Sequence, residues 1–422
     1  MVAVMAAASA PPVSAPRSPL ALLGANPRFA LLSLVMLMPA MSFGAVGVAR
    51  VREATYVFGG VAGIGTIATV AALAAGVAAI PAGAIADAIN PRIVFVVASF
   101  LGALVNIVGT VLAMRDALQP GQFMMLAAFD GAIAAINSTS VVPMQMSLVD
   151  SADTGAAQIV HVVRLSVGAL VGTIVANVFS NTGTVVLVSS ALLASSSLIA
   201  WFLVRPSAVQ SAGRARRHTR ASIGDVFRVI GADHGLRNAI VVMLAMNLVV
   251  PTQLVAVVLA DNQLSRFSFP AAMAGLIGAL GARLVLMKTG LALPVTRTLR
   301  TTFGFYTALT AFGAILLWFD ALLGRLPLVV IMVFLGTAAS SITLEFTSAL
   351  VQQTCPDDIR GRITGLLTSA RALMTAIGAT LATSIQISAD EPELVTVLAL
   401  AALAVLVGSR GFSRIPDPSR AA

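Results

Sequence analysis

The segment Gly83-Ala-Ile-Ala-Asp87-Ala-Ile-Asn-Pro-Arg92 places an acid and a base between two long apolar stretches of the chain. Charged residues are rare for a long distance on both sides, so this short polar run stands out from its surroundings. Such a run is typical of a connection between two membrane-crossing helices, because charged side chains are excluded from the lipid core. The segment therefore indicates a chain that crosses a membrane on either side of it.

The composition is that of a membrane protein. Of the 422 residues, 58% are hydrophobic and 10% are charged, whereas a soluble domain carries about 25% charged residues. Lipid must therefore cover much of the surface. A single cysteine, Cys355, excludes a disulfide framework and a cysteine-based metal site. The three histidines lack the spacing of metal ligands, so we expect neither a metal nor another cofactor.

Apolar runs long enough to cross a bilayer recur along the whole chain. A hydrocarbon core of about 30 Å needs about 20 helical residues, and runs that are continuously apolar exclude the alternating pattern of a β-barrel. We predict an all-α integral membrane protein with twelve transmembrane helices in two six-helix bundles. The predicted spans are 29–49, 58–82, 93–113, 122–147, 156–179, 184–204, 238–260, 269–293, 302–319, 326–350, 363–387 and 394–409.

The spans divide the chain into two related halves. A shift of 207 residues aligns Asp150 with Asp357 and Arg164 with Arg371, which indicates a weak internal repeat. The predicted segments are a disordered cytoplasmic tail (1–27), an N-terminal bundle (28–204), a basic cytoplasmic linker (205–237), a C-terminal bundle (238–409) and a cytoplasmic tail (410–422).

The basic residues predict the orientation in the membrane. With the N-terminus in the cytoplasm, 17 of the 26 lysine and arginine residues fall in inner segments, as the positive-inside rule requires. Five fall in outer loops, namely Arg50, Arg52, Arg115, Arg266 and Arg325. We therefore expect a multi-pass protein of the cell membrane with both termini in the cytoplasm. The net charge of +9 is concentrated in the linker, which has no aromatic residue beside its bases except Phe227, so we expect no nucleic-acid partner.

Two motifs resemble those of the major facilitator superfamily. The pattern Gly83-x-x-x-Asp87-x-x-x-x-Arg92 is similar to the superfamily's signature between its second and third helices. The segment Arg360-Gly-Arg362 resembles part of the loop between helices ten and eleven of its efflux-type members. The resemblance implies that Asp87 locks an inner gate in the outward-open state and that Arg92 supports it.

The sequence also departs from the superfamily's patterns. The second-half copy of the signature, Gly290 to Arg297, has no acid, which implies an asymmetric inner gate. Helix five of many drug antiporters ends in a Gly-Pro motif, whereas here Gly168 and Gly172 are followed by Thr173. We interpret this glycine pair as a contact between helices, because small residues let membrane helices approach closely.

Seven ionisable side chains fall within the predicted spans, where a charge costs about 2.5–3.5 kcal/mol to insert. We expect them to face the interior and to pair there. His161 and Arg164 are three residues apart and share a helix face, and Asp130 shares one with Asn137. The seven are Asp130, His161, Arg164, Arg283, Lys288, Glu345 and Arg371.

By the resemblance, Asp130 and Glu345 line the transport path, and Asn247 and Gln253 join them from the seventh span. We predict that Asp130 or Glu345 carries a coupling proton, because burial favours the neutral form of a carboxyl while a nearby arginine opposes it. Two alternatives remain open. Asp130 could be an outer-gate residue in water, and Glu345 could form a structural pair with Arg371 or Arg283.

These features favour a secondary active transporter that works by alternating access and exports a small amphipathic or drug-like compound by proton coupling. Proton-coupled import of a small metabolite or anion is the alternative, and a non-transporting receptor or scaffold is a third. No catalytic or nucleotide-binding motif occurs, so we expect neither an enzyme nor ATP-driven transport. The expected partners are the substrate, protons and the lipid bilayer, and the expected working unit is a monomer.

Overall fold

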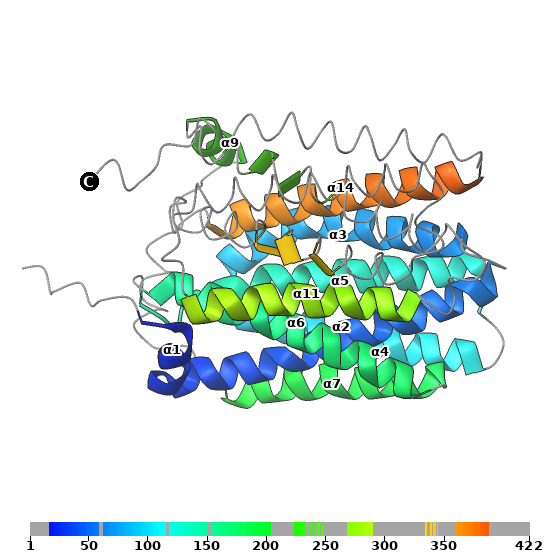
Figure 1. Ribbon diagram of the computed structural model, residues 1–422, viewed down its shortest axis with the longest axis horizontal. Coiled ribbons are helices and arrows are strands. Elements are labelled where there is room, and N and C mark those ends of the chain that lie inside the picture. The colour runs from blue at the N-terminus through cyan, green and yellow to red at the C-terminus, as the bar shows by residue number, and fades with distance from the viewer. Residues whose placement is uncertain are drawn as a thin grey trace, which may run out of the picture.

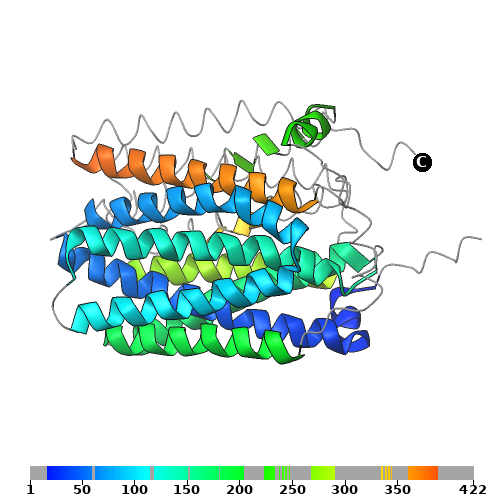
Figure 2. The same cartoon turned by 180° about the vertical axis from the view of Figure 1, so that it is seen from behind.

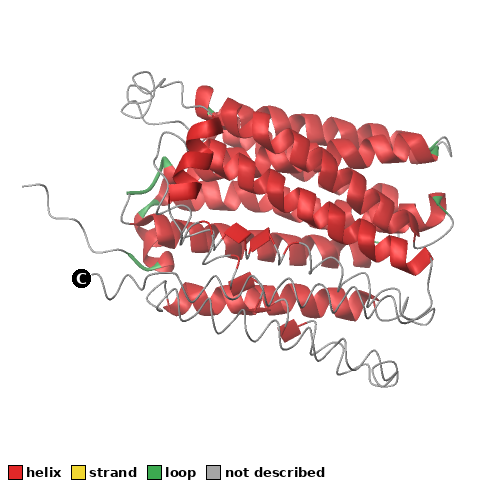
Figure 3. Cartoon of the chain, turned by 90° about the horizontal axis from the view of Figure 1, so that it is seen from above, coloured by secondary structure: helices red, strands yellow, loops and turns green. Residues whose placement is uncertain are grey.

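The computed structural model describes residues 17–58, 62–114, 118–150, 153–179, 181–203, 223–232, 268–289 and 360–387, with isolated positions between 237 and 247 and between 334 and 344. All regular structure in these ranges is helical. The long helices run side by side along the longest axis of the molecule (Figures 1 and 3).

Six long apolar helices make up the described N-terminal half, and each is long enough to cross a bilayer. Three of them begin with proline, which is favoured at the first helical position because its missing N–H has no partner there anyway. Large apolar side chains such as Phe100, Leu101 and Phe202 are exposed on the outside of this half, as a lipid-facing surface requires. The six helices are α2 (Pro27–Val57), α3 (Ala62–Ala88), α4 (Pro91–Met114), α5 (Pro120–Met146), α6 (Thr154–Val178) and α7 (Thr182–Leu203).

Three more helices are described beyond residue 203. Helix α9 (Ile223–Ala232) lies within the predicted linker, and α11 (Ser268–Thr289) and α14 (Arg360–Ile387) correspond to the predicted spans 269–293 and 363–387. The predicted spans 238–260, 302–319, 326–350 and 394–409 lie wholly or mostly outside the described residues.

Two helices run further than the apolar pattern predicts. Helix α2 continues to Val57, so Arg50 and Arg52 lie in its last turns and not in an outer loop, which corrects the prediction for these two residues. No glycine or proline interrupts residues 48–58, so nothing in the backbone ends the helix at the first charge. Helix α3 likewise continues to Ala88, so only Ile89 and Asn90 separate it from α4.

The N-terminal tail differs in part from the predicted disorder. Residues Pro19–Ala25 form a short helix, α1, whose first turn is capped by the Ser18 hydroxyl. The Asn26 side chain accepts a hydrogen bond from the Phe29 amide at 3.0 Å and donates one to the Leu148 carbonyl at 2.7 Å. This asparagine therefore begins α2 and ties it to the end of α5.

Glycines set the close contacts inside the N-terminal half. A Cβ at Gly172 would lie 2.1 Å from the Met41 carbonyl oxygen, and one at Gly168 would lie 2.4 Å from the Ala40 Cβ, so α6 contacts α2 through this pair. The interpretation of the pair as a helix-packing contact is confirmed. At Gly131 a Cβ would lie 2.0 Å from a carbonyl oxygen of α3, so α5 and α3 are in similar contact.

Among the described helices, the two halves of the chain meet mainly along two pairs. Helix α14 lies along α3, and α11 lies against α6 (Figures 1 and 2). Near one end of the first pair, the Thr69 and Thr380 hydroxyls form a hydrogen bond of 3.0 Å. Near the other end, a Cβ at Gly365 would lie 2.6 Å from the Ala79 carbonyl oxygen. Helices α3 and α14 are therefore antiparallel and in contact over most of their length.

Candidate functional site

A buried ion cluster joins α2 to α5. The Arg50 Nε donates to Asp130 Oδ2 at 2.9 Å, and the Arg50 Nη1 donates to Glu53 Oε2 at 3.0 Å. The guanidinium also lies 5.7 Å from the ring centre of the fully buried Phe123, an attractive distance for a cation over an aromatic face. Arg50 is only 5% exposed. We call Arg50, Glu53 and Asp130 the Arg50 cluster.

Helix α4 leaves room for this cluster. A Cβ at Gly109 would lie 3.3 Å from Arg50 Nη2 and 3.4 Å from Nη1, so a larger residue there would press on the guanidinium. Nη2 is buried and has no hydrogen-bond partner in the described part of the chain. The cluster thus holds two carboxylates and one guanidinium, which gives one excess negative charge when both acids are ionised.

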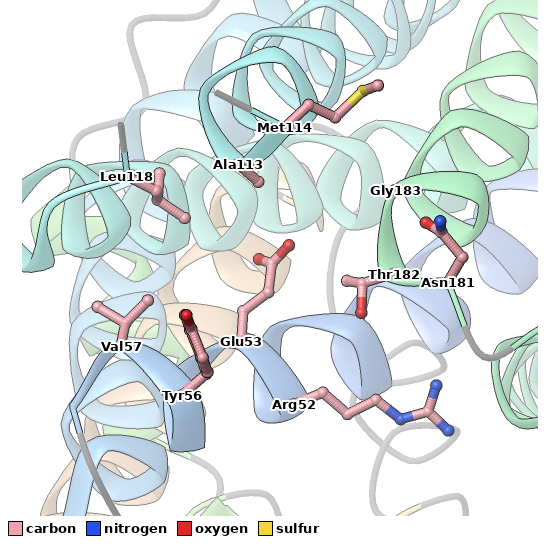
Figure 4. Close-up of a pocket in the computed structure, with 10 residues that line it drawn as sticks. All are labelled: Arg52, Glu53, Tyr56, Val57, Ala113, Met114, Leu118, Asn181, Thr182 and Gly183. Atoms are coloured by element: carbon pink, nitrogen blue, oxygen red, sulfur yellow. The ribbon is translucent and has the colours of Figure 1, made fainter. Parts of the chain in front are cut away.

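A cavity of about 560 Å³ lies next to the cluster, between the end of α2, the end of α4 and the start of α7. Glu53 and Tyr56 point from α2 toward α4 across this space (Figure 4). Asn181 and Thr182 line it from α7, and the rest of the lining is mostly apolar. Glu53 therefore belongs both to the Arg50 cluster and to the wall of the cavity.

Arg52 projects from the same turn toward a different helix. Its Nη1 donates to the Ala176 carbonyl at 2.8 Å and to the Phe179 carbonyl at 3.3 Å, and its Nη2 donates to Asn177 Oδ1 at 3.0 Å. These carbonyls lie at the end of α6, where the last acceptors of a helix lack partners within it. Arg52 therefore caps α6, a structural role.

A second charged group lies between α6 and α11. The Arg164 Nη2 and His161 Nδ1 are 2.7 Å apart, which confirms that these two residues share a helix face. Arg283 on α11 donates to the Ser166 hydroxyl on α6, two residues after Arg164. Arg164 is 6% exposed and His161 is 7% exposed. We call His161, Arg164 and Arg283 the Arg164 cluster.

The remaining predicted cavity residues are not gathered into one site. Asn137 accepts a hydrogen bond from the Ser99 hydroxyl at 3.3 Å and so faces α4, whereas Asp130 faces α2. The Asn247 amide donates to the Met243 carbonyl of its own turn, and Arg371 is half-buried on α14. Gln253 and Glu345 lie outside the described residues.

The predicted gating motif spans the turn between α3 and α4. Gly83 is buried in α3, and Arg92, the second residue of α4, donates to the Trp201 carbonyl of α7 with its guanidinium 5.3 Å from that indole ring. The backbone at Asp87 is one turn beyond Gly83, whose Cα would lie 3.3 Å from a Cβ at Gly365. The antiparallel register thus places the Asp87 backbone beside the first turn of α14, and its gating role stays a prediction.

The apolar pattern missed Arg50 and Glu53 as site residues. It treated the first charge after a long apolar run as the end of a span, although the two opposite charges three residues apart are typical of a continuing helix. In the described part of the chain, no three His, Cys, Asp or Glu side chains come together to hold a metal ion.

Comparisons with known proteins agree on the fold. Helices similar to these are found in the human organic anion transporter MFSD10 (TETRAN), with a TM-score of 0.69 and 13% identity over 91% of this chain and 98% of that chain. The E. coli fucose:proton symporter FucP gives a TM-score of 0.68 and 13% identity over 94% of this chain and 100% of that chain. At these identities the likeness shows the fold alone.

No curated protein sequence matches this chain. The sequence model of the Major Facilitator Superfamily, in contrast, matches residues 29–379, which is most of the chain. The match includes the Gly83–Arg92 motif, the Arg50 and Arg164 clusters and the helices through which the two halves meet. The chain therefore belongs to the Major Facilitator Superfamily and is an all-α, multi-pass membrane protein of this family of transporters.

Proposed function

We propose that this transporter works by alternating access, is coupled to protons, and exports a small amphipathic compound. The observation that carries the coupling is the Arg50 cluster, in which two carboxylates share one buried guanidinium. A fully ionised cluster holds one excess negative charge, and burying an unbalanced charge costs several kcal/mol. Uptake of one proton makes the cluster neutral and removes that cost.

The same cluster offers a way to link the proton to movement. Arg50 is shared between Glu53 on its own helix and Asp130 on α5, so a proton on either acid weakens one of its two bonds and leaves the other. A change in the bond between α2 and α5 alters the packing of two helices that, by the superfamily resemblance, line the transport path. Proton binding and helix position are then thermodynamically linked.

The side from which the proton is taken up follows from the predicted orientation. In the predicted orientation, α2 begins in the cytoplasm, so the cavity at its far end faces the outside. Glu53 lines this cavity, which supports proton uptake from the outside. Entering protons drive export when the second compound moves in exchange and import when it moves with them. The likeness of Arg360-Gly-Arg362 to the loop of efflux-type members favours export.

Proteoliposomes with an imposed pH gradient test this proposal. The wild-type protein is screened against a panel of amphipathic compounds, and the compound accumulated best is carried forward. We expect the double variant with Glu53→Gln and Asp130→Asn to lose uphill accumulation but to keep exchange of labelled for unlabelled compound, since exchange needs no net proton movement.

Asp153→Asn is the matched control. Asp153 is also buried and bound, to the Arg17 amide at 2.8 Å, but it lies at the start of α6, away from the cluster. Uphill accumulation that is the same in the double variant and the control would refute the coupling role. Accumulation that requires the outside of the vesicles to be the acidic side would identify an importer. A protein that moves no compound in either assay would refute transport.

A further inference from the structure

We propose that Arg164, together with His161 and Arg283, binds the anionic group of the substrate, and that the transported compound is an organic carboxylate. The inference rests on the proposed transport function and adds the chemical class of the substrate. It comes from the bonding of Arg164, which differs from that of Arg50.

Arg164 is a buried cation with most of its hydrogen-bonding capacity unused. A guanidinium has five N–H donors in a rigid fork. Arg164 makes one hydrogen bond, to His161, and its Nε and Nη1 are buried without a partner in the described part of the chain. Buried hydrogen-bond donors without an acceptor cost free energy, so a ligand that accepts hydrogen bonds from them is bound strongly.

The charges around Arg164 point to an anion. None of the ion pairs of the described residues involves Arg164, whereas Arg50, at a similar burial, holds two carboxylates. Arg283 brings a second guanidinium to the same place from α11, where it donates to Ser166. Arg50 therefore has two acids beside it, whereas Arg164 has none among the described residues.

The hydrogen bond within the cluster fixes the role of His161. Arginine can only donate, so His161 Nδ1 accepts from Arg164 and the ring proton lies on Nε2. The imidazole then offers one further donor. Arg164 and His161 thus present N–H groups from one guanidinium and one ring, a set suited to an oxyanion and unsuited to a cation.

The planar fork of Arg164 selects a carboxylate among oxyanions. Nε and an Nη of one guanidinium lie parallel and match the two oxygens of a carboxylate in a bidentate pair. The two edges that can do this are Nε with Nη2 and Nη1 with Nη2. Nη2 carries two N–H groups and His161 accepts from one of them, so the other remains to pair with the unbonded Nε or Nη1 on one edge of the guanidinium.

The position of the cluster suits a transported ligand. Arg164 lies ten residues into the 25-residue helix α6, about 15 Å from its start at Thr154 and therefore near the middle of the span. Arg283 belongs to the other half of the chain, and α6 contacts α11. An anion bound by both arginines would contact both halves, so its binding free energy depends on how the halves are arranged.

A thermal-shift assay on the purified full-length protein in detergent tests the proposal without requiring transport. The probes are aromatic and aliphatic monocarboxylates, each beside its neutral primary amide, with sodium phosphate and sodium sulfate as further anions. We expect at least one carboxylate to raise the melting temperature while its amide does not. Arg164→Gln should weaken that binding roughly ten- to a hundredfold, because it removes charged hydrogen bonds.

Two variants keep the result interpretable. Lys288→Gln removes an exposed base at the end of α11 and should bind like the wild type. Arg164→Lys keeps the charge but loses the fork, so it should bind a carboxylate more weakly than the wild type even if Arg164→Gln does not fold. A carboxylate that stabilises Arg164→Lys as well as it stabilises the wild type would overturn the proposal.

The outcomes also separate this proposal from the transport proposal. Stabilisation by amides and carboxylates alike, by phosphate or sulfate alone, or by no probe overturns the carboxylate site, whatever the transport assay shows. Carboxylate binding that depends on Arg164 supports the site even if no uphill transport is found. The variant Asp153→Asn should keep the carboxylate-dependent shift, because Asp153 lies at the start of α6, outside both clusters.

Discussion

The contact between α2 and α6 can be tested by adding a single methyl group. In the variant Gly172→Ala, the new Cβ would lie 2.1 Å from the Met41 carbonyl oxygen and 2.8 Å from the Ala45 amide nitrogen. Carbon atoms in favourable contact are about 3.5–4.0 Å apart, so the two helices must separate by about 1 Å or more. Both atoms belong to the backbone, so no side-chain rotation relieves the overlap.

The expected cost follows from overpacking, which destabilises by about 1–3 kcal/mol. Alanine also has a higher helix propensity than glycine, by about 1 kcal/mol, which partly offsets the overlap. The variant Gly47→Ala isolates this second effect, because Gly47 lies in the interior of α2 with no atom within 4 Å of an added Cβ. The difference between the two variants therefore reports the overlap alone, about 1–3 kcal/mol.

The measurement is unfolding of the purified protein in mixed micelles by increasing SDS, followed by circular dichroism. We expect Gly47→Ala to unfold at the wild-type SDS fraction or slightly above it, and Gly172→Ala at a clearly lower one. Equal stability of the two alanine variants would refute the reasoning, because it would mean that α2 and α6 separate without cost.

Three further predictions concern movement and coupling. Asp87→Asn should lower the transport rate in an inserted and folded protein, because it removes the carboxylate that, by the superfamily resemblance, locks the inner gate. An unchanged rate in vesicles would count against the gate. Thr380→Val removes the hydrogen bond with Thr69 between the two halves. If separation of this contact limits the rate, substrate exchange should become up to about tenfold faster. A slower exchange would contradict this prediction. Gly109→Leu should press on the Arg50 guanidinium and reduce pH-driven accumulation more than substrate exchange, and equal loss of both would show a general packing defect.

The sequence predicted the parts of the fold that depend on local pattern. Apolar length placed the six helices of the N-terminal half to within a few residues in most cases, and the three-residue spacing of His161 and Arg164 predicted that they share a helix face. Prediction from the sequence failed where a residue far away in the chain decides how a segment folds. Arg50 was expected in water because its partner Asp130 is 80 residues away in the chain, and only the folded bundle brings the two together.

The N-terminal tail is a second case in which distant partners decide the local structure. Ser18 followed by Pro19 is a good start for a helix, but a seven-residue helix needs outside contacts, and those come from the Arg17 bond to Asp153 and the Asn26 bond to Leu148. These partners are far away in sequence and unmarked by any motif, so composition alone predicted disorder.

The four cross-links made by the two ends of α2 and the residues just before it bear on how this half of the protein moves. At one end Arg50 holds α5 and Arg52 holds α6, and at the other Asn26 reaches the end of α5 and Arg17 reaches the start of α6. Because α2 is bound to α5 and α6 near both of its ends, it resists sliding along these helices and separating from them. We expect these contacts to hold α2, α5 and α6 together as one unit, with protonation at the Arg50 cluster loosening one of the four, so that most of the movement during transport takes place where this half meets the other.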